Sequence, residues 1–132
     1  MKYFTIEELT RSTTATARGI DNTPTEAAKK SLQYLIENLL DPIRARYGAP
    51  ISVNSGYRSM ALNAAVGGVA TSQHVSGEAA DVTVGSKGSN RDLFELILNS
   101  GLEFDQLIDE KDYSWIHISL KESRNRRQVL KL

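Results

Sequence analysis

The stretch Ser72–Val82, with the sequence SQHVSGEAADV, brings together side chains that can hold a metal ion. It contains His74, one of only two histidines, and seven residues later the aspartate Asp81, which opens an apolar run. The other histidine, His117, lies in Trp115–Leu120, whose alternation of polar and apolar residues is typical of a strand with one buried face. Two imidazoles and one carboxylate suit a catalytic zinc ion, because three protein ligands leave the fourth position open. These residues suggest a hydrolase with a single zinc ion.

The composition is that of one small domain. The chain has 132 residues, of which 40% are hydrophobic, enough for one core without cross-links. It contains no cysteine, so a metal would need nitrogen and oxygen ligands. The formal net charge is zero, with 16 basic and 16 acidic side chains, which argues against a nucleic acid as partner. We expect a monomer.

The N-terminal residues Met1–Glu8 carry acidic side chains where a signal peptide needs an apolar core. No apolar run of 18 residues occurs anywhere in the chain, so no transmembrane segment is expected. These features predict a protein that is made in the cytoplasm without a signal peptide.

Residues 1–22 are expected to form an N-terminal arm or loop beside a core of residues 23–132, all within one domain. Thr5 and Glu8 fit a capping box that starts a short helical turn. Residues 10–22 are rich in Thr, Ser, Arg and Gly and show no periodicity, so we interpret them as a loop.

A long helix is expected between Thr23 and Gly48. Thr23 as the N-cap and Pro24 at the first helical position form a start signal, and apolar residues then recur at helical spacing. The pair Asp41-Pro42 should kink or restart this helix, and Gly48 should end it.

The rest of the chain alternates between strands and helices. The expected strands are Ile51–Asn54, Ala79–Val84, Phe104–Glu110, Trp115–Leu120 and an edge strand Gln128–Leu132, and the expected helices are Met60–Val66 and Arg91–Ser100. Ser59 should cap the first of these helices and Asn90 the second. This order predicts an α+β fold, in which an antiparallel sheet has helices on one face and a cleft on the other.

Strand alternation places the candidate ligands in that cleft. Successive side chains of a strand point to opposite faces of the sheet. Asp81 and His117 each point away from the aliphatic face of their own strands. If the two strands are neighbours, helices cover the aliphatic face and both ligands lie on the other. By the same parity Glu110 can point into the cleft.

Several motifs between Ile51 and Leu120 occur together in a specific order. They are Ser55-Gly56-Tyr57-Arg58-Ser59, Asn63, Gly67-Gly68, Ser72-Gln73-His74 through Gly77, Ala80-Asp81-Val82 and Trp115-Ile116-His117-Ile118-Ser119. In combination and spacing they resemble the zinc D-alanyl-D-alanine carboxypeptidases, a family that includes L-alanyl-D-glutamate endopeptidases and bacteriophage endolysins and shares the hedgehog/DD-peptidase fold. The resemblance implies one Zn²⁺, held by His74, Asp81 and His117, and a metallopeptidase that hydrolyses peptide bonds in the stem peptides of bacterial peptidoglycan.

Such hydrolysis needs a carboxylate that takes a proton from water and passes it to the leaving amine. Several members of the family have a glutamate three residues before the last histidine, but Ser114 occupies that position here. Glu110 and Asp112 are the nearest candidates for the general base. Glu110 is preferred because strand parity can aim it at the cleft.

Four further residues are expected to contact the substrate. The resemblance implies Arg58 as a cation in the active site, and its guanidinium suits two-point binding of a substrate carboxylate. Ser72 and Gln73 are expected to hydrogen-bond a bound peptide, and Trp115 to form a wall of the cleft.

Other interpretations of these residues stay open. Taken singly, His74 fits a surface residue, His117 a structural histidine and Arg58 a structural ion pair. Ser114 leaves room for a catalytically inactive module that binds the cell wall and keeps the fold. A nucleic-acid or structural partner protein that uses the arginines of residues 124–127 is disfavoured by the zero net charge.

The expected place of action follows from the expected substrate. A cell-wall peptidase made without a signal peptide would reach its substrate after release through a membrane pore or by another export route. We therefore expect cell-wall degradation of the kind that a phage endolysin performs.

Overall fold

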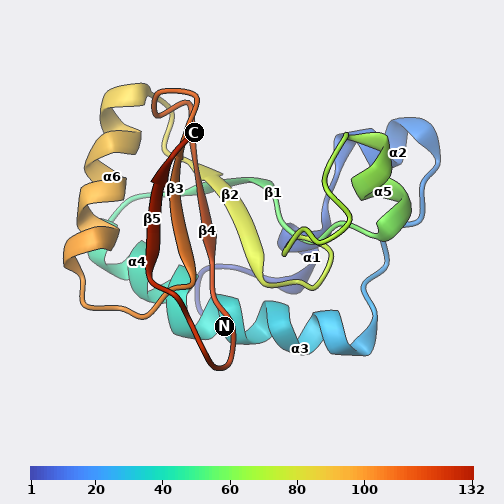
Figure 1. Ribbon diagram of the computed structural model, residues 1–132, viewed down its shortest axis with the longest axis horizontal. Coiled ribbons are helices and arrows are strands. Elements are labelled where there is room, and N and C mark those ends of the chain that lie inside the picture. The colour runs from blue at the N-terminus through green and yellow to red at the C-terminus, as the bar shows by residue number, and fades with distance from the viewer.

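The computed structural model describes residues 1–132, in which a central sheet separates two groups of helices (Figure 1). Its strands are β1 (Ser52–Ser55), β2 (Ala79–Thr83), β3 (Gln106–Glu110), β4 (Trp115–Ser119) and β5 (Gln128–Lys131), and they lie in the order β1-β2-β4-β3-β5. All neighbouring strands are antiparallel except β3 and β5, which are parallel. The predicted α+β fold is confirmed, but the sheet is mixed, because residues 120–127 return the chain to the start of β3 before β5 begins.

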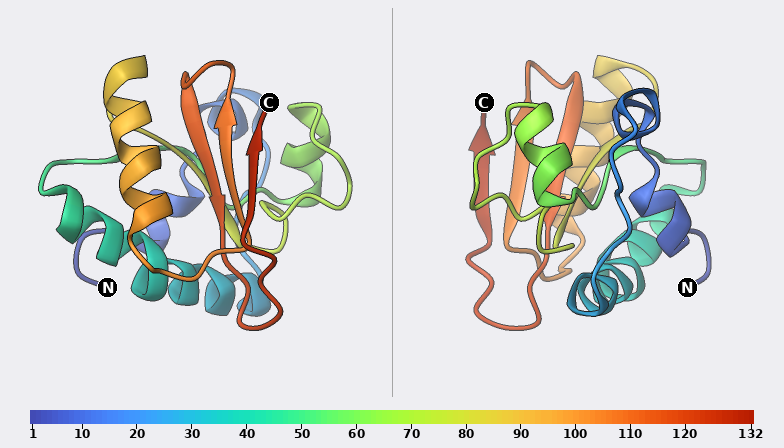
Figure 2. Two further views of the ribbon diagram at one scale, coloured as in Figure 1. Left: turned by 60° about the vertical axis from the view of Figure 1, so that its left-hand side comes forward. Right: turned by 90° about the vertical axis from the view of Figure 1, so that its right-hand side faces the viewer.

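The helices are distributed over both sides of the sheet (Figures 1 and 2). They are α1 (Ile6–Thr10), α2 (Thr13–Arg18), α3 (Glu26–Leu35), the π-helical turn η1 (Ile36–Leu40), α4 (Asp41–Tyr47), α5 (Met60–Ala65) and α6 (Lys87–Asn99). In Figure 1, α6 lies on one side of the strands, while α2 and α5 lie on the other. No helix is both long enough and apolar enough to span a membrane.

The core lies on one face of the sheet, as strand alternation predicts. Ala80 and Val82 of β2 and Ile116 and Ile118 of β4 are 3% exposed or less and pack in one cluster with side chains of α3 and α6. A fully buried side chain of the size of valine or isoleucine stabilises the fold by about 1.5–3 kcal/mol. This burial fixes the register of β2 on β4, since a slip of one residue would turn the aliphatic side chains out of the core.

The long helix begins later than predicted. Thr25 is the N-cap and accepts a hydrogen bond from the backbone N–H of Ala28, so α3 starts at Glu26 and the prediction of Thr23 as N-cap is wrong. The N–H of Thr23 instead donates to the carboxylate of Asp21 in a local turn. The predicted change at Asp41-Pro42 is confirmed, because η1 separates α3 from α4 and the chain regains an α-helix at Asp41.

The prediction of a loop at residues 10–22 is wrong, since α2 forms there. Ser12 caps it by accepting a hydrogen bond from Ala15 N–H, and Gly19 ends it in the left-handed region at φ 64°. The helix shows no apolar periodicity because Ala15 is its one buried residue. The N-terminal segment is also part of the core, where Phe4 and Leu9 are buried.

Asn90 does not cap α6 as predicted. Ser86 is the cap and accepts a hydrogen bond from Ser89 N–H, so the helix begins at Lys87. Asn90 is 1% exposed and its side-chain amide donates to the carbonyl oxygens of Tyr113 and Ser114. It therefore ties α6 to the turn between β3 and β4.

Candidate metal centre

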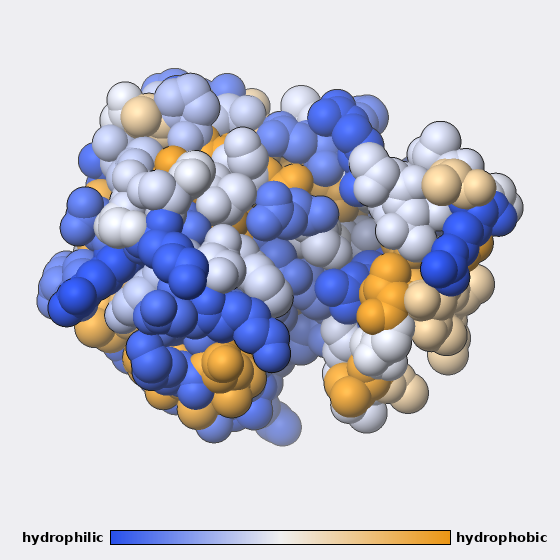
Figure 3. All heavy atoms as spheres, turned by 90° about the horizontal axis from the view of Figure 1, so that it is seen from above, coloured by the Kyte–Doolittle hydropathy of each residue, from blue (hydrophilic) through white to orange (hydrophobic).

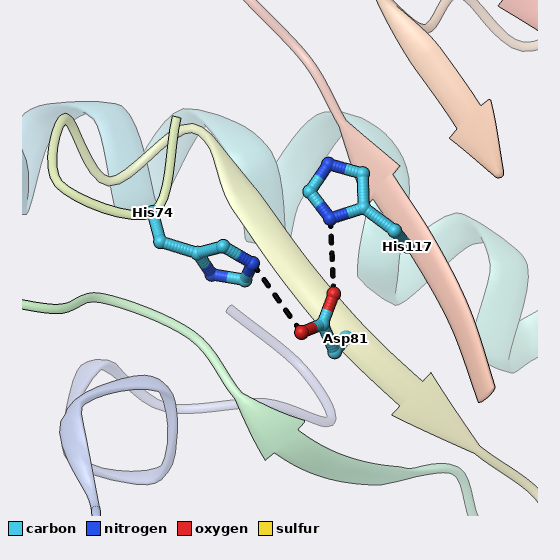
Figure 4. Close-up of side chains that lie close together, drawn as sticks. All are labelled: His74, Asp81 and His117. Carbon is cyan, nitrogen blue, oxygen red and sulfur yellow. Dashed lines mark hydrogen bonds and ion pairs between the residues drawn. The ribbon is translucent and has the colours of Figure 1, made fainter. Parts of the chain in front are cut away.

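Three side chains from separate parts of the chain converge on one point (Figure 4). His74 comes from the loop before β2, Asp81 from β2 and His117 from β4. Asp81 and His117 are direct partners in the register of the two strands, so both point to the face opposite the core. The carboxylate lies between the imidazoles, with Oδ1 2.9 Å from His117 Nδ1 and Oδ2 3.4 Å from His74 Nε2.

His74 is held in place from its far side. Its Nδ1 donates a hydrogen bond to the carbonyl oxygen of Gly56 at 2.7 Å, and its own carbonyl oxygen accepts one from the backbone N–H of Arg58. Gly56 must be a glycine because a Cβ atom there would overlap the carbonyl oxygen of Leu9. A histidine that binds a metal through one nitrogen usually donates its other N–H to a carbonyl or carboxylate, and this arrangement directs Nε2 toward Asp81.

Asp81 is charged under ordinary conditions. Burial is the largest single influence on it and disfavours the charged form, but hydrogen bonds and charge from His117 and His74 together hold its pKa well below its usual range. The side chains of Asp81 and His117 each keep 13% of their area exposed, whereas that of His74 keeps 5%. The cluster is therefore shielded from solvent but not closed off from it.

These three residues fit a metal ion. One donor atom from each of the three lies within 4.8 Å of the other two. Because the carbonyl of Gly56 can only accept, His74 carries a proton on Nδ1, so in the neutral form of the ring the lone pair of Nε2 faces the Asp81 carboxylate. Two acceptors face each other stably when a cation lies between them. Two imidazole nitrogens and one carboxylate oxygen are the donors of a catalytic zinc site.

Arg58 lies next to this cluster and is itself firmly oriented. Its Nη2 is 3.7 Å from Asp81 Oδ2, its Nε donates to the hydroxyl of Ser55 and its Nη1 donates to the amide oxygen of Asn63. The guanidinium therefore adds a fixed positive charge at the edge of the site, and its contact with the substrate stays a prediction.

A family model described as Peptidase M15 matches residues 2–119. The chain belongs to the Peptidase M15 family. It is also similar to the zinc D-Ala-D-Ala carboxypeptidase of Streptomyces albus G, with 51% identity over 39 residues. That match covers 30% of this chain and spans only 15% of the length of the curated relative. The family predicted from the motifs is thus confirmed, and the three candidate ligands lie within residues 2–119, which the family model matches.

In this member of the Peptidase M15 family, Ser72 and Gln73 hold the loop that carries His74. The Ser72 hydroxyl accepts a hydrogen bond from His74 N–H, and the Gln73 amide donates to the Asp105 carboxylate at 3.0 Å. Gln73 Oε1 is buried and has no hydrogen-bond partner. Substrate binding by Ser72 and Gln73 stays a prediction, while their bonds within the protein give them a structural role.

The candidate bases of this M15 family member differ in position. Glu110 pairs with Trp115 in the register of β3 and β4, where Ile108 pairs with His117, so Glu110 and Trp115 share the face of His117. Asp112 lies in the exposed turn, 3.8 Å from Lys87 of α6. Geometry therefore favours Glu110 over Asp112, although its role as base stays a prediction.

Several supporting residues escaped the sequence analysis. Ser55, Gly56 and Asn63 were identified from the sequence only as parts of motifs, without a role. Asp105 is fully buried and receives hydrogen bonds from Gln73 and from the guanidinium of Arg126. Nothing in the sequence links these partners, because Gln73 lies 32 residues before Asp105 and Arg126 lies 21 after it.

Proposed function

We propose that this chain is a zinc-dependent peptidase that hydrolyses an amide bond in the stem peptides of bacterial peptidoglycan. The convergence of His74, Asp81 and His117 in a member of the Peptidase M15 family carries this proposal. The similarity to a protein named zinc D-Ala-D-Ala carboxypeptidase supports zinc as the metal and the stem peptide as the substrate class.

His74, Asp81 and His117 would hold the ion, the first through the Nε2 atom that Gly56 leaves free. When bound, zinc polarises the scissile carbonyl and lowers the pKa of a water molecule toward neutrality. The Asp81 carboxylate keeps its charge because its pKa is held low, so it is a ligand without first having to lose a proton.

The remaining residues would handle the proton and the substrate. Glu110 would take a proton from the attacking water and deliver it to the leaving amine, as a general base and then a general acid. Arg58, fixed by Ser55 and Asn63, would bind a carboxylate or carbonyl oxygen of the substrate. Trp115 would contact the peptide from the same face as Glu110.

Two bonds fit this chemistry, a terminal D-alanine bond and a bond within the stem. Mass spectrometry of purified peptidoglycan fragments incubated with the zinc-loaded protein distinguishes them, with a chelated sample as control. Release of D-alanine identifies a carboxypeptidase, and two stem fragments identify an endopeptidase. If zinc is bound and no product forms over long incubation, the peptidase proposal is wrong.

The second candidate is a catalytically inactive module that binds the cell wall, which Ser114 favours because it stands where several relatives have a glutamate. Replacing Glu110 by Ala separates the two candidates. We expect a loss of hydrolysis of about 100-fold or more, because a general base contributes that much. The matched variant Asp112→Ala, in the turn between β3 and β4, should hydrolyse at the parental rate. Unchanged hydrolysis by Glu110→Ala would remove Glu110 as the base.

The proposed place of action is the cell wall, reached after release from the cytoplasm as a phage endolysin would be. Expression in bacterial cells tests this. Lysis should require co-expression of a membrane pore, and lysis without a pore would contradict that route.

A further inference from the structure

A cavity lies beside the candidate metal cluster rather than around it. It has a volume of about 650 Å³, which is within the range of small-ligand sites. One wall is formed by α1 and α2, another by β1 and a third by α5. Figure 3 shows the surface hollowed between the body that contains the sheet and the lobe that contains α2 and α5. The N-terminal segment, which has no role in the chemistry above, thus builds part of a cavity.

The cavity runs along an open edge of the sheet. It is lined by six consecutive residues, Pro50 to Ser55. Side chains of a strand alternate between faces, so a cavity that touches all of them lies along the strand edge and not over one face. β1 is the outermost strand and pairs only with β2, with a bulge between Val53 and Ser55. Half of the backbone groups of such an edge point outward, and an extended peptide can pair with them.

Two unpaired charges line the same cavity. Arg11 and Glu8 both contribute to its wall, and neither takes part in any ion pair of the protein. The remaining polar lining consists of hydroxyl and amide side chains from α2 and β1. A ligand that presents one carboxylate and one ammonium group would match both charges, whereas a uniformly anionic ligand would be repelled by Glu8.

Arg58 connects this cavity to the metal cluster. Its side chain lines the cavity, and its Nη2 is 3.7 Å from Asp81. A peptide bound at the metal cluster can therefore continue past Arg58 onto the edge of β1.

We propose that this cavity binds the part of the substrate peptide that extends beyond the metal cluster. The peptide adds to β1 as an extended strand, its carboxylate pairs with Arg11 and its ammonium group pairs with Glu8. This inference rests on the proposed peptidase function for the identity of the substrate, but the binding itself requires neither metal nor hydrolysis.

Fluorescence anisotropy with a labelled pentapeptide, Ala-D-Glu-Lys-D-Ala-D-Ala, tests the proposal. Binding is measured twice, with zinc and with chelator. It is compared with a neutral peptide of the same length, in which D-Gln and acetyl-lysine replace the charged residues, the label caps the N-terminus and an amide replaces the C-terminal carboxylate. We expect Arg11→Glu to weaken binding of the charged peptide about tenfold, as the loss of a charge-assisted contact does, and to leave the neutral peptide unaffected. Arg18→Glu, in the same segment but outside the cavity, is the matched control.

A second measurement locates the peptide. In amide ¹H–¹⁵N spectra recorded with chelator, the charged peptide should shift the signals of Ser52–Ser55 and Arg11 more than those of β5, the opposite edge of the sheet. Equal binding by Arg11→Glu and the parent protein, or shifts confined to other elements, would overturn the cavity site even if the zinc-loaded protein cleaves the peptide. Binding and shifts as expected without any cleavage would support the cavity and contradict the peptidase function instead.

Discussion

Asp81 and Asp105 are both shielded carboxylates near the same loop, but their partners differ in kind. Asp81 is faced by two imidazoles, with the Arg58 guanidinium at 3.7 Å, whereas Asp105 is faced by the Arg126 guanidinium, the Lys121 ammonium and the Gln73 amide, with no imidazole. An imidazole can offer a lone pair to a metal, and a guanidinium or an ammonium cannot. The first carboxylate is therefore suited to hold a cation, while the second is already neutralised by the protein.

The loop that carries His74 joins these two clusters. His74 reaches Asp81 while its neighbour Gln73 reaches Asp105. At its far end, Gly77 turns the chain at φ 76° where a Cβ atom would lie 2.6 Å from the carbonyl oxygen of Ala28. The comparison suggests that the Asp81 cluster binds the metal, while the Asp105 cluster positions the loop that carries His74.

The largest effect is expected for Asp81→Asn. The amide has no charge and is a poor metal ligand, so zinc affinity should fall by more than about 100-fold. That is a larger loss than is usual when a residue that only hydrogen-bonds to a metal ligand is replaced. Isothermal titration with zinc measures this, and circular dichroism should show an unchanged fold. Near-parental zinc affinity would remove Asp81 from the ligand set.

Asp105→Asn should damage stability more than metal binding. A hydrogen bond from the Arg126 guanidinium is the largest influence on this carboxyl and holds its pKa well below its usual range, against the opposing effect of burial. Loss of these charge-assisted hydrogen bonds should lower the free energy of unfolding by about 2 kcal/mol, measured by urea denaturation without zinc. A larger loss of zinc affinity than in Asp81→Asn would reverse the roles of the two carboxylates.

The stabilisation by Asp105 should depend on pH in a defined direction. Because the folded protein lowers the pKa of this carboxyl, the contribution is complete above the ordinary value of about 3.9 and is lost as pH falls through the folded value. The difference in unfolding free energy between the parent and Asp105→Asn should stay constant from about pH 7 to pH 5 and narrow below about pH 4. A difference in unfolding free energy that grows as the pH falls would contradict a lowered pKa of Asp105 in the folded protein.

The smallest effect is expected for Gln73→Met, which removes the amide between the two clusters and keeps the side-chain volume. Zinc affinity should fall roughly threefold to tenfold, because Gln73 orients the ligand His74 without touching the metal. Thr71→Ala, an exposed position in the same loop, is the matched control and should bind zinc as the parent does. If Gln73→Met binds peptide more weakly while its zinc affinity is unchanged, the predicted contact with substrate is favoured over positioning.

Local chemistry made much of this fold predictable. Ser59 caps α5, Gly48 ends α4 in the left-handed region and β4 alternates as expected, because each depends on the side chain present at that position or on its immediate neighbours. The predictions for residues 10–22, where α2 forms, and for Asn90 were wrong because local chemistry does not decide either of them. One buried alanine leaves no periodic signal, and an asparagine that could cap a helix instead bonds to a turn 23 residues away.

By itself, the sequence determined the family, the α+β class and the face on which Asp81 and His117 lie, because strand alternation depends only on the order of residues. Only the tertiary structure decided that Gly56 holds His74, that Gln73 joins Asp105 and that Arg11 and Glu8 line a cavity beside β1. These contacts join segments distant in sequence. They depend on how the loops and the N-terminal helices pack against the sheet, which no local pattern encodes.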